Sequence, residues 1–193
     1  MNKSRLEAFS DGVIAIAITI MVLDLKMPQG AGFADLLKLV PQLLSYVLSF
    51  TYVGIYWVNH HHLLQAASRV NGRILWANLH LLFWLSLIPF VTNWVAEHHL
   101  DPAPVALYGG VLLMCSVSFS LLRRALIACE GHASRVAQVF GKGIKNAGSI
   151  VLYAMAIPLS LWSPVAGSVI YVLLALLWFI PSHRLEGMSS GQS

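Results

Sequence analysis

Long apolar runs separated by short polar segments dominate this sequence and constrain its fold more than any other feature. Only 10% of its 193 residues are charged, whereas a soluble domain carries roughly 25% charged residues. So little charge cannot cover a compact body in water, and most of the surface must therefore face lipid. We predict an all-α membrane protein with six transmembrane helices per chain, at about residues 5–25, 40–62, 73–95, 104–125, 146–162 and 165–181.

These runs form one predicted domain, residues 1–181, in the lipid bilayer. Residues 182–193 are polar and rich in Gly and Ser, and we expect a disordered cytoplasmic tail there. Six spans place both termini on one side. Of the 12 lysines and arginines, only Lys26 and Lys38 fall on the opposite side, so we predict a multi-pass protein with both termini cytoplasmic. Because the basic excess follows topology, we expect no nucleic-acid partner.

An acidic residue enters the first predicted span. Only twelve uncharged residues separate Asp11 from Asp24, which is about 18 Å of helix against a hydrocarbon core of about 30 Å. Ser4 and Glu7 have the spacing of a capping box, which predicts that the helix begins at Arg5. Asp11 then lies in the cytoplasmic leaflet and needs partners, unless a thinned bilayer leaves it solvated.

The polar ends of the second and third predicted spans lie at the depth of Asp11. The second ends in Asn59 and three histidines, residues 60–62, and the third contains Asn78. We expect a hydrogen-bond network in which one or two histidines and Asn78 satisfy Asp11, with the choice of histidine left open. Adjacent helical residues point about 100° apart, so the three histidines do not form a structural metal site.

The first predicted helix also carries a stripe of candidate pore residues. At about 100° per residue, a sector about 60° wide contains Gly12, Ile16, Thr19 and Leu23, with Ile20 at its edge. The helix is apolar on all sides, so periodicity alone cannot identify a pore face. Thr19 either lines a pore or bonds back to its own helix.

The run Arg5-Leu6-Glu7-Ala8-Phe9-Ser10-Asp11 resembles a family signature. It is similar to the Arg-x-x-x-Phe-Ser-Asp pattern that opens the first span of the endolysosomal and prokaryotic potassium channels, the transmembrane protein 175-like family. Trp57, Asn59, His60 and His61 end the second span much as in that family, and Asn78 in the third is also similar. The later spans resemble the family in hydropathy only.

The resemblance implies a homotetramer in a bacterial inner (plasma) membrane, with a central pore lined by the first helix. Such a channel has no TVGYG filter or pore helix and needs no cofactor. The implied constriction or gate is formed by Ile16, Ile20 and Leu23, and Thr19 aids selectivity, so permeant potassium ions pass near Ile16 and Thr19. The implied signature and inter-helix network comprises Arg5, Phe9, Ser10, Asp11, Trp57, Asn59, His60, His61 and Asn78.

We therefore predict a potassium-selective, leak-type ion channel. The alternative is a proton-coupled membrane transporter that uses Asp11, the histidines and Asn78 as a relay, although the paired broken spans of an inverted repeat are not evident. An enzyme is not expected: no H-E-x-x-H motif is present, and the one G-x-S-x-G string, at residues 187–191, lies in the polar tail and not at a predicted strand-to-helix elbow. The run of residues 51–56, TYVGIY, is not a potassium filter because its backbone is needed to hold a continuous span together.

Overall fold

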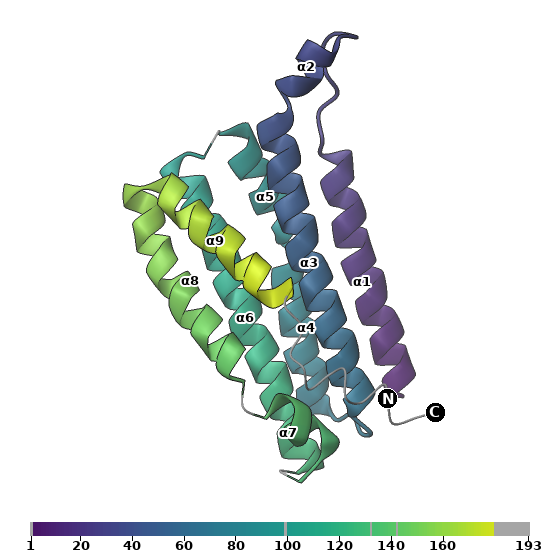
Figure 1. The fold of residues 1–193 in the computed structure, drawn as a ribbon. Helices are drawn as coiled ribbons and strands as arrows, with labels where there is room; N and C mark the ends of the chain where they lie inside the picture. The colour runs from purple at the N-terminus through teal and green to yellow at the C-terminus, as the bar shows by residue number, and fades with distance from the viewer. Residues whose placement is uncertain (1, 99, 132, 142, 180–193) are drawn as a thin grey trace.

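The structure, a computed structural model, describes residues 2–98, 100–131, 133–141 and 143–179, and in these ranges the only regular secondary structure is α-helix (Figure 1). The helices are α1 (Lys3–Leu23), α2 (Phe33–Leu37), α3 (Val40–Ala66), α4 (Gly72–Ser86), α5 (Ile88–Glu97), α6 (Pro102–Glu130), α7 (Arg135–Phe140), α8 (Ile144–Trp162) and α9 (Pro164–Phe179). The tail predicted at residues 182–193 lies outside the described residues.

Over the described residues, each of the six predicted apolar runs coincides with a helix, and the third run is divided between two helices. α4 ends at Ser86 and α5 begins at Ile88, with Pro89 in its first turn. Proline has no N–H to donate and its ring displaces the carbonyl one turn earlier, which interrupts the helix. Among the described residues, four segments are long and apolar enough to cross a membrane, namely α1, α4 with α5, α6 and α8; α9 is apolar but has 16 residues.

The start of α1 differs from the expectation. The helix begins at Lys3, and the side chain of its N-cap, Asn2, accepts a hydrogen bond from the backbone N–H of Ser4 at 3.3 Å. Asparagine satisfies a free amide at this position as well as serine does. The predicted capping box is therefore wrong, and Glu7 instead lies 3.8 Å from the Lys3 ammonium one turn away.

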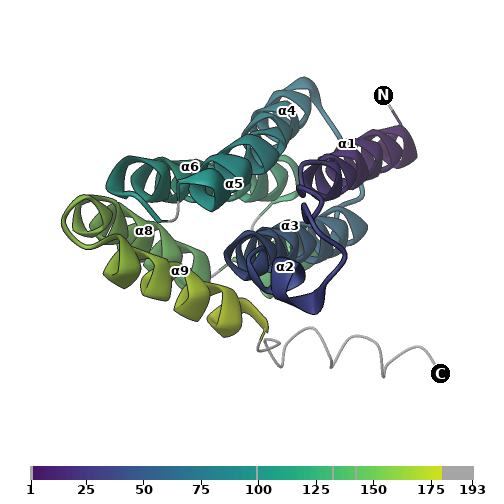
Figure 2. The same cartoon turned by 90° about the horizontal axis from the view of Figure 1, so that it is seen from above.

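α1 lies at one edge of the bundle and α8 at the opposite edge, and α9 runs from the α8 edge toward α3 (Figures 1 and 2). α6 runs between them and contacts α4, α5, α8 and α9. α1 packs on α3, α4 and α5. Its buried residues recur every three or four positions, as one face of a helix requires: Leu6, Ser10, Ile14, Ala17 and Met21.

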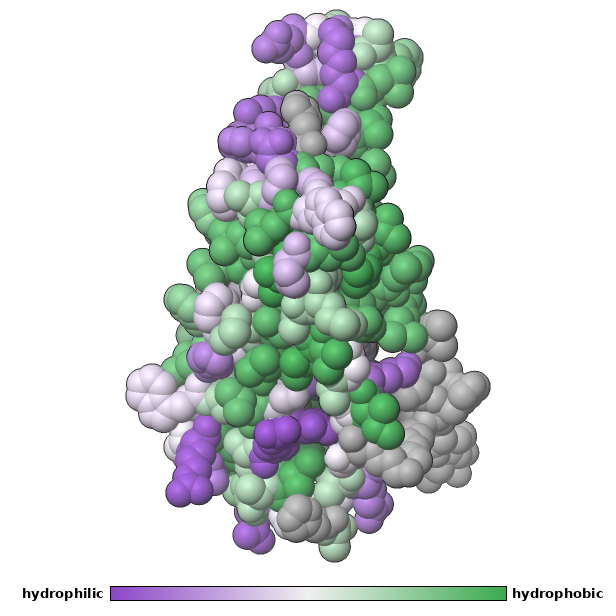
Figure 3. Space-filling model, turned by 90° about the vertical axis from the view of Figure 1, so that its left-hand side faces the viewer, coloured by the Kyte–Doolittle hydropathy of each residue, from purple (hydrophilic) through white to green (hydrophobic). Residues whose placement is uncertain are grey.

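A broad apolar band separates two polar ends on the face that includes the α8 and α9 edge (Figure 3). These two helices expose large apolar side chains along much of their length, including Val151, Met155, Leu161, Val169 and Leu173. A face of this kind would be unfavourable in water and is expected where a protein meets lipid.

Glu130 links the end of α6 to the connection between α3 and α4. One carboxylate oxygen accepts hydrogen bonds from the Ser68 N–H, from the Ser68 hydroxyl at 2.9 Å and from the Arg69 N–H at 2.8 Å. The carboxylate therefore holds these helix ends together.

α8 and α9 pack closely at Gly167. A Cβ atom there would lie 1.9 Å from the Oγ and 2.9 Å from the Cβ of Ser160. The close approach places the Ser160 hydroxyl 3.1 Å from the hydroxyl of Tyr171 on α9. Glycine at position 167 is therefore required by the distance between the two helices.

Replacing this glycine tests the packing of α9. Gly167→Ala should destabilise the protein by about 1–3 kcal/mol, because the added methyl group overpacks the contact with Ser160. The control is Gly148→Ala on α8, where an added Cβ meets nothing within 4 Å; it should stabilise the helix by up to about 1 kcal/mol. Thermal unfolding of the purified protein in detergent measures both, and equal Tm values would contradict the close approach.

Candidate functional site

Three side chains from α1, α3 and α4 form a buried hydrogen-bonded chain. Asn78 donates from Nδ2 to the Ser10 hydroxyl at 2.9 Å, and its Oδ1 lies 2.7 Å from Nε2 of His60. Ser10 donates to the carbonyl of Leu6 at 2.8 Å. Because Asn78 Oδ1 can only accept, His60 donates from Nε2.

This chain, Ser10–Asn78–His60, is the polar centre of the contact between α1 and its neighbours. Ser10 and Asn78 are fully buried and His60 is 1% exposed. An unpaired polar group at such a position costs several kcal/mol in an apolar medium. The three residues satisfy one another only when α1, α3 and α4 keep this arrangement, so they hold α1 in one orientation.

Asp11 has a different partner from the one predicted. The indole Nε1 of Trp57 donates to Asp11 Oδ1 at 2.9 Å. No hydrogen bond joins Asp11 to a histidine or to Asn78 among the described residues. The expectation that these groups satisfy Asp11 is therefore wrong, because adjacent helical positions point about 100° apart and Ser10, not Asp11, faces Asn78.

The remaining network candidates lie around these contacts. The ring of His61 stacks on Trp57, with ring centroids 5.9 Å apart, and so supports the indole that binds Asp11. Asn59 donates to the carbonyl of Ile55 in its own helix at 2.8 Å. Arg5 and Phe9 are exposed on α1. In the part of the chain that the structure describes, no group of three or more His, Cys, Asp or Glu could hold a metal ion.

The predicted constriction residues lie on the exposed face of α1. Ile16 is 59% exposed, Ile20 43% and Leu23 81%. Thr19 is also exposed, and its hydroxyl donates to the carbonyl of Ile16 at 2.9 Å, a common arrangement for threonine in a helix. Since that bond uses the hydroxyl hydrogen, the oxygen keeps lone pairs for another donor or a cation.

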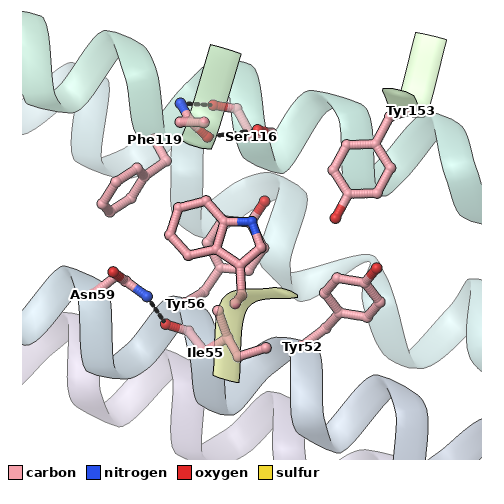
Figure 4. A pocket seen from close by; sticks show the side chains of 9 residues that line it. Tyr52, Ile55, Tyr56, Asn59, Ser116, Phe119 and Tyr153 are labelled. Carbon is pink, nitrogen blue, oxygen red and sulfur yellow. Dashed lines mark hydrogen bonds between the residues drawn. The ribbon is translucent and has the colours of Figure 1, made fainter. Parts of the chain in front are cut away.

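A second polar cluster joins α6 to α8, and sequence reasoning missed it. Asn146 donates from Nδ2 to the Ser116 carbonyl at 3.2 Å and to the Ser120 hydroxyl, and it accepts from the Ser116 hydroxyl at 2.7 Å. Figure 4 shows the adjoining cavity of about 20 Å³, where Tyr52 and Tyr56 of α3 face Ser116 and Tyr153. Such a volume holds roughly one water molecule. The sequence signal that could have indicated this cluster was the presence of Ser116, Ser120 and Asn146 within predicted apolar runs.

The fold, the apolar band and these buried polar clusters define an α-helical integral membrane protein. A profile of the family described as "Endosomal/lysosomal potassium channel TMEM175" matches residues 5–89. The chain is 50% identical over 186 residues to Potassium channel HX13_20290 of Chryseobacterium sp. (strain P1-3), which covers 96% of this chain and 97% of that protein. The chain belongs to the TMEM175 family, which confirms the resemblance read from the sequence.

Two further comparisons also match proteins named TMEM175 or TMEM175 homolog. A crystal structure of a lysosomal potassium-selective channel TMEM175 homolog from Chamaesiphon minutus matches with a TM-score of 0.80 at 28% identity, and the match covers 92% of this chain and 96% of that one. The human protein named Endosomal/lysosomal proton channel TMEM175 is 37% identical over 87 residues, which covers 37% of this chain and 17% of the human protein.

A stability measurement can test the buried hydrogen bonds of Asn78. Asn78→Leu keeps the volume but leaves His60 and Ser10 without their partner, and it should destabilise the protein by about 1–3 kcal/mol. The control is Asn59→Leu, which removes a hydrogen bond only within α3 and should have less than half that effect. Thermal unfolding in detergent compares the two, and equal losses would show that Asn78 does not hold α1.

Proposed function

We propose that this protein is a potassium-selective ion channel and not an enzyme. The observation that carries the proposal is the 50% identity, over almost the full length of both chains, to a protein named as a potassium channel. The fold of the potassium-selective homolog from Chamaesiphon minutus supports it independently of that relative.

In the proposed assembly, four copies of the chain surround one axis, with the exposed face of α1 lining the pore. One chain cannot enclose a pore with a single helix, whereas a closed cyclic oligomer can. Two properties of α1 support this arrangement. The helix lies at an edge of the bundle (Figure 2), and its outward face carries large apolar side chains, those of Ile16, Ile20 and Leu23.

The proposed conduction route has a hydrophobic constriction at Ile16, extended outward by Ile20 and Leu23. A ring of aliphatic side chains binds no ion and closes a narrow pore by excluding water. Opening then requires the α1 helices to spread or rotate. The hydrogen-bonded residues Ser10, Asn78 and His60 couple such movement to α4, and through α4 to α3, since α1 cannot turn alone without breaking the buried hydrogen bond between Ser10 and Asn78.

The proposed topology has six membrane spans, formed by α1, α3, α4 with α5, α6, α8 and α9, with both termini in the cytoplasm of a bacterium. The excess of lysine and arginine on the side of the termini supports this orientation. It also places Asp11 and its partner Trp57 near the inner end of the pore helix.

A proton-conducting function is the second candidate, because the human relative is named as a proton channel. The geometry favours it less. The Ser10 hydroxyl hydrogen points to a backbone carbonyl, and the indole of Trp57, which binds Asp11, can donate a hydrogen bond but cannot accept a proton. In the part of the chain that the structure describes, the contacts of α1 therefore form no continuous chain of exchangeable protons.

Reversal potentials in proteoliposomes test the proposed function and the role of Thr19. Under a potassium/sodium gradient the wild type should reverse near the potassium equilibrium potential, and under a pH gradient alone it should reverse near zero. Thr19→Val removes the hydroxyl oxygen and should lower the potassium-to-sodium permeability ratio severalfold. Thr19→Ser restores the oxygen and should recover it. A wild type that follows the proton gradient would overturn the proposal, and an unchanged ratio in Thr19→Val would exclude Thr19 from selectivity.

Substitution at Ile16 tests the constriction. Ile16→Asn should raise potassium flux about tenfold, because a polar ring keeps the narrow segment hydrated. The control is Val22→Asn, another exposed apolar position on α1 that points about 120° away from Ile16; its flux should match the wild type. Single-channel recording measures both, and equal effects of the two substitutions would place the constriction elsewhere.

A further inference from the structure

A second site is suggested by a groove of about 600 Å³ between the end of α6, α7 and the start of α8. Its described lining residues include two adjacent arginines of α6, Arg123 and Arg124, and none of them is acidic. The other lining residues are small or apolar: Ile127, Ala128, Ala137, Gly141, Gly143 and Ala147. The groove lies at the end of the bundle opposite α2, where α7 is seen in Figure 1.

Not every N–H group of the Arg123 guanidinium has a hydrogen-bond partner among the described residues. The residue is only 9% exposed, and its Nη1 donates to the carbonyls of Phe140 at 2.7 Å and Gly141 at 3.5 Å. Its Nε is buried and has no hydrogen-bond partner within the described ranges. Within the described residues the carboxylate ion pairs involve Lys3, Lys26 and Lys38, and neither arginine of the groove takes part in one. Two neighbouring arginines therefore have no carboxylate counter-ion among the residues that the structure describes.

The start of α8 adds positive potential to the same groove. Its N-cap, Gly143, has a φ of 50° and provides no side-chain cap, and its first turn contains Lys145 but no acidic residue. Helix N-termini present free N–H groups and favour negative charge. The Arg123 guanidinium lies directly against Gly143, since a Cβ atom there would be 1.9 Å from Nη1. Basic side chains and a helix N-terminus therefore lie together, and both favour a bound anion.

We propose that this groove binds a phosphate-bearing anion, with Arg123, Arg124 and the first amides of α8 as donors. The planar fork of a guanidinium matches two phosphate oxygens, and further phosphate oxygens can accept from backbone amides. The volume exceeds that of a bare ion, and the alanines and Ile127 in its wall fit the carbon atoms next to a phosphodiester. The phosphate belongs either to the headgroup of an anionic lipid or to a free phosphate.

The proposal goes beyond potassium conduction, because none of these residues lies on α1 or in its contacts. With the termini in the cytoplasm, the groove faces the inner leaflet, where anionic headgroups and basic protein groups attract one another. A lipid bound there would join α6 to α8 and stabilise the half of the chain farthest from α1.

The experiment measures the Tm of the purified protein in an uncharged detergent during titration with soluble short-chain lipids. The probes are dioctanoyl phosphatidylglycerol, dioctanoyl phosphatidylcholine and inorganic phosphate, at constant ionic strength. A ligand that binds only the folded state raises the Tm by mass action. Phosphatidylglycerol should raise it saturably and at lower concentration than the net-neutral phosphatidylcholine.

Two variants locate the effect. Arg124 is exposed, so Arg124→Gln should fold, and it should weaken the apparent affinity for phosphatidylglycerol about tenfold, as expected for the loss of one charge-assisted hydrogen bond. The matched control is Arg73→Gln, an exposed arginine at the start of α4, which should retain wild-type affinity.

The outcomes separate the sources of the phosphate. A Tm rise with phosphatidylglycerol alone identifies a lipid headgroup site, and a rise with inorganic phosphate as well identifies a site for the phosphate group itself. The absence of any rise, an unchanged affinity in Arg124→Gln, or an equal loss in Arg73→Gln would overturn the proposal. Each of these failures would leave the channel function intact, because binding is measured without ion flux.

Discussion

The structure depends on the requirement that polar groups inside a membrane be satisfied by protein. Lipid offers no hydrogen bonds, so the Ser10 hydroxyl, the Asn78 amide and the His60 imidazole must bind one another. They come from α1, α4 and α3, and their pairing holds three helices in one relative orientation. Apolar contacts between the same helices are not directional and would tolerate rotation of α1 about its axis.

The fixed orientation of α1 gives the helix one buried face and one exposed face. One face carries Leu6, Ser10 and Ile14 and is buried, whereas the other carries Ile16, Thr19 and Leu23 and is exposed within a single chain. In a tetramer the exposed face is free to meet its copies around an axis. Asp11 lies between the two faces. Its carboxylate accepts a hydrogen bond from Trp57, and this bond does not involve Ser10 or Asn78, which orient the helix.

Much of the helical layout could be predicted because hydropathy reports directly on lipid contact. The predicted runs fall on helices, and the family was identified from the first-helix signature. Details set by single contacts could not be predicted. The N-cap of α1 is Asn2 and not Ser4, since either residue satisfies the same amide. The partner of Asp11 is the indole of Trp57 and not an imidazole. The sequence could not predict this partner, because it depends on how α3 is rotated against α1. The Ser116–Asn146 contact had no motif at all.

By itself, the amino-acid sequence determined that the chain is an α-helical membrane protein of the TMEM175 family and that its first helix carries acidic and hydroxyl groups within an apolar span. Local composition and spacing suffice for these properties, since each depends on residues close together in the chain. Only the tertiary structure decided which polar groups meet, which face of α1 is left exposed, and that Arg123 comes to lie against the start of α8. Those outcomes depend on helix rotation and crossing distances, which are set by packing between residues far apart in sequence.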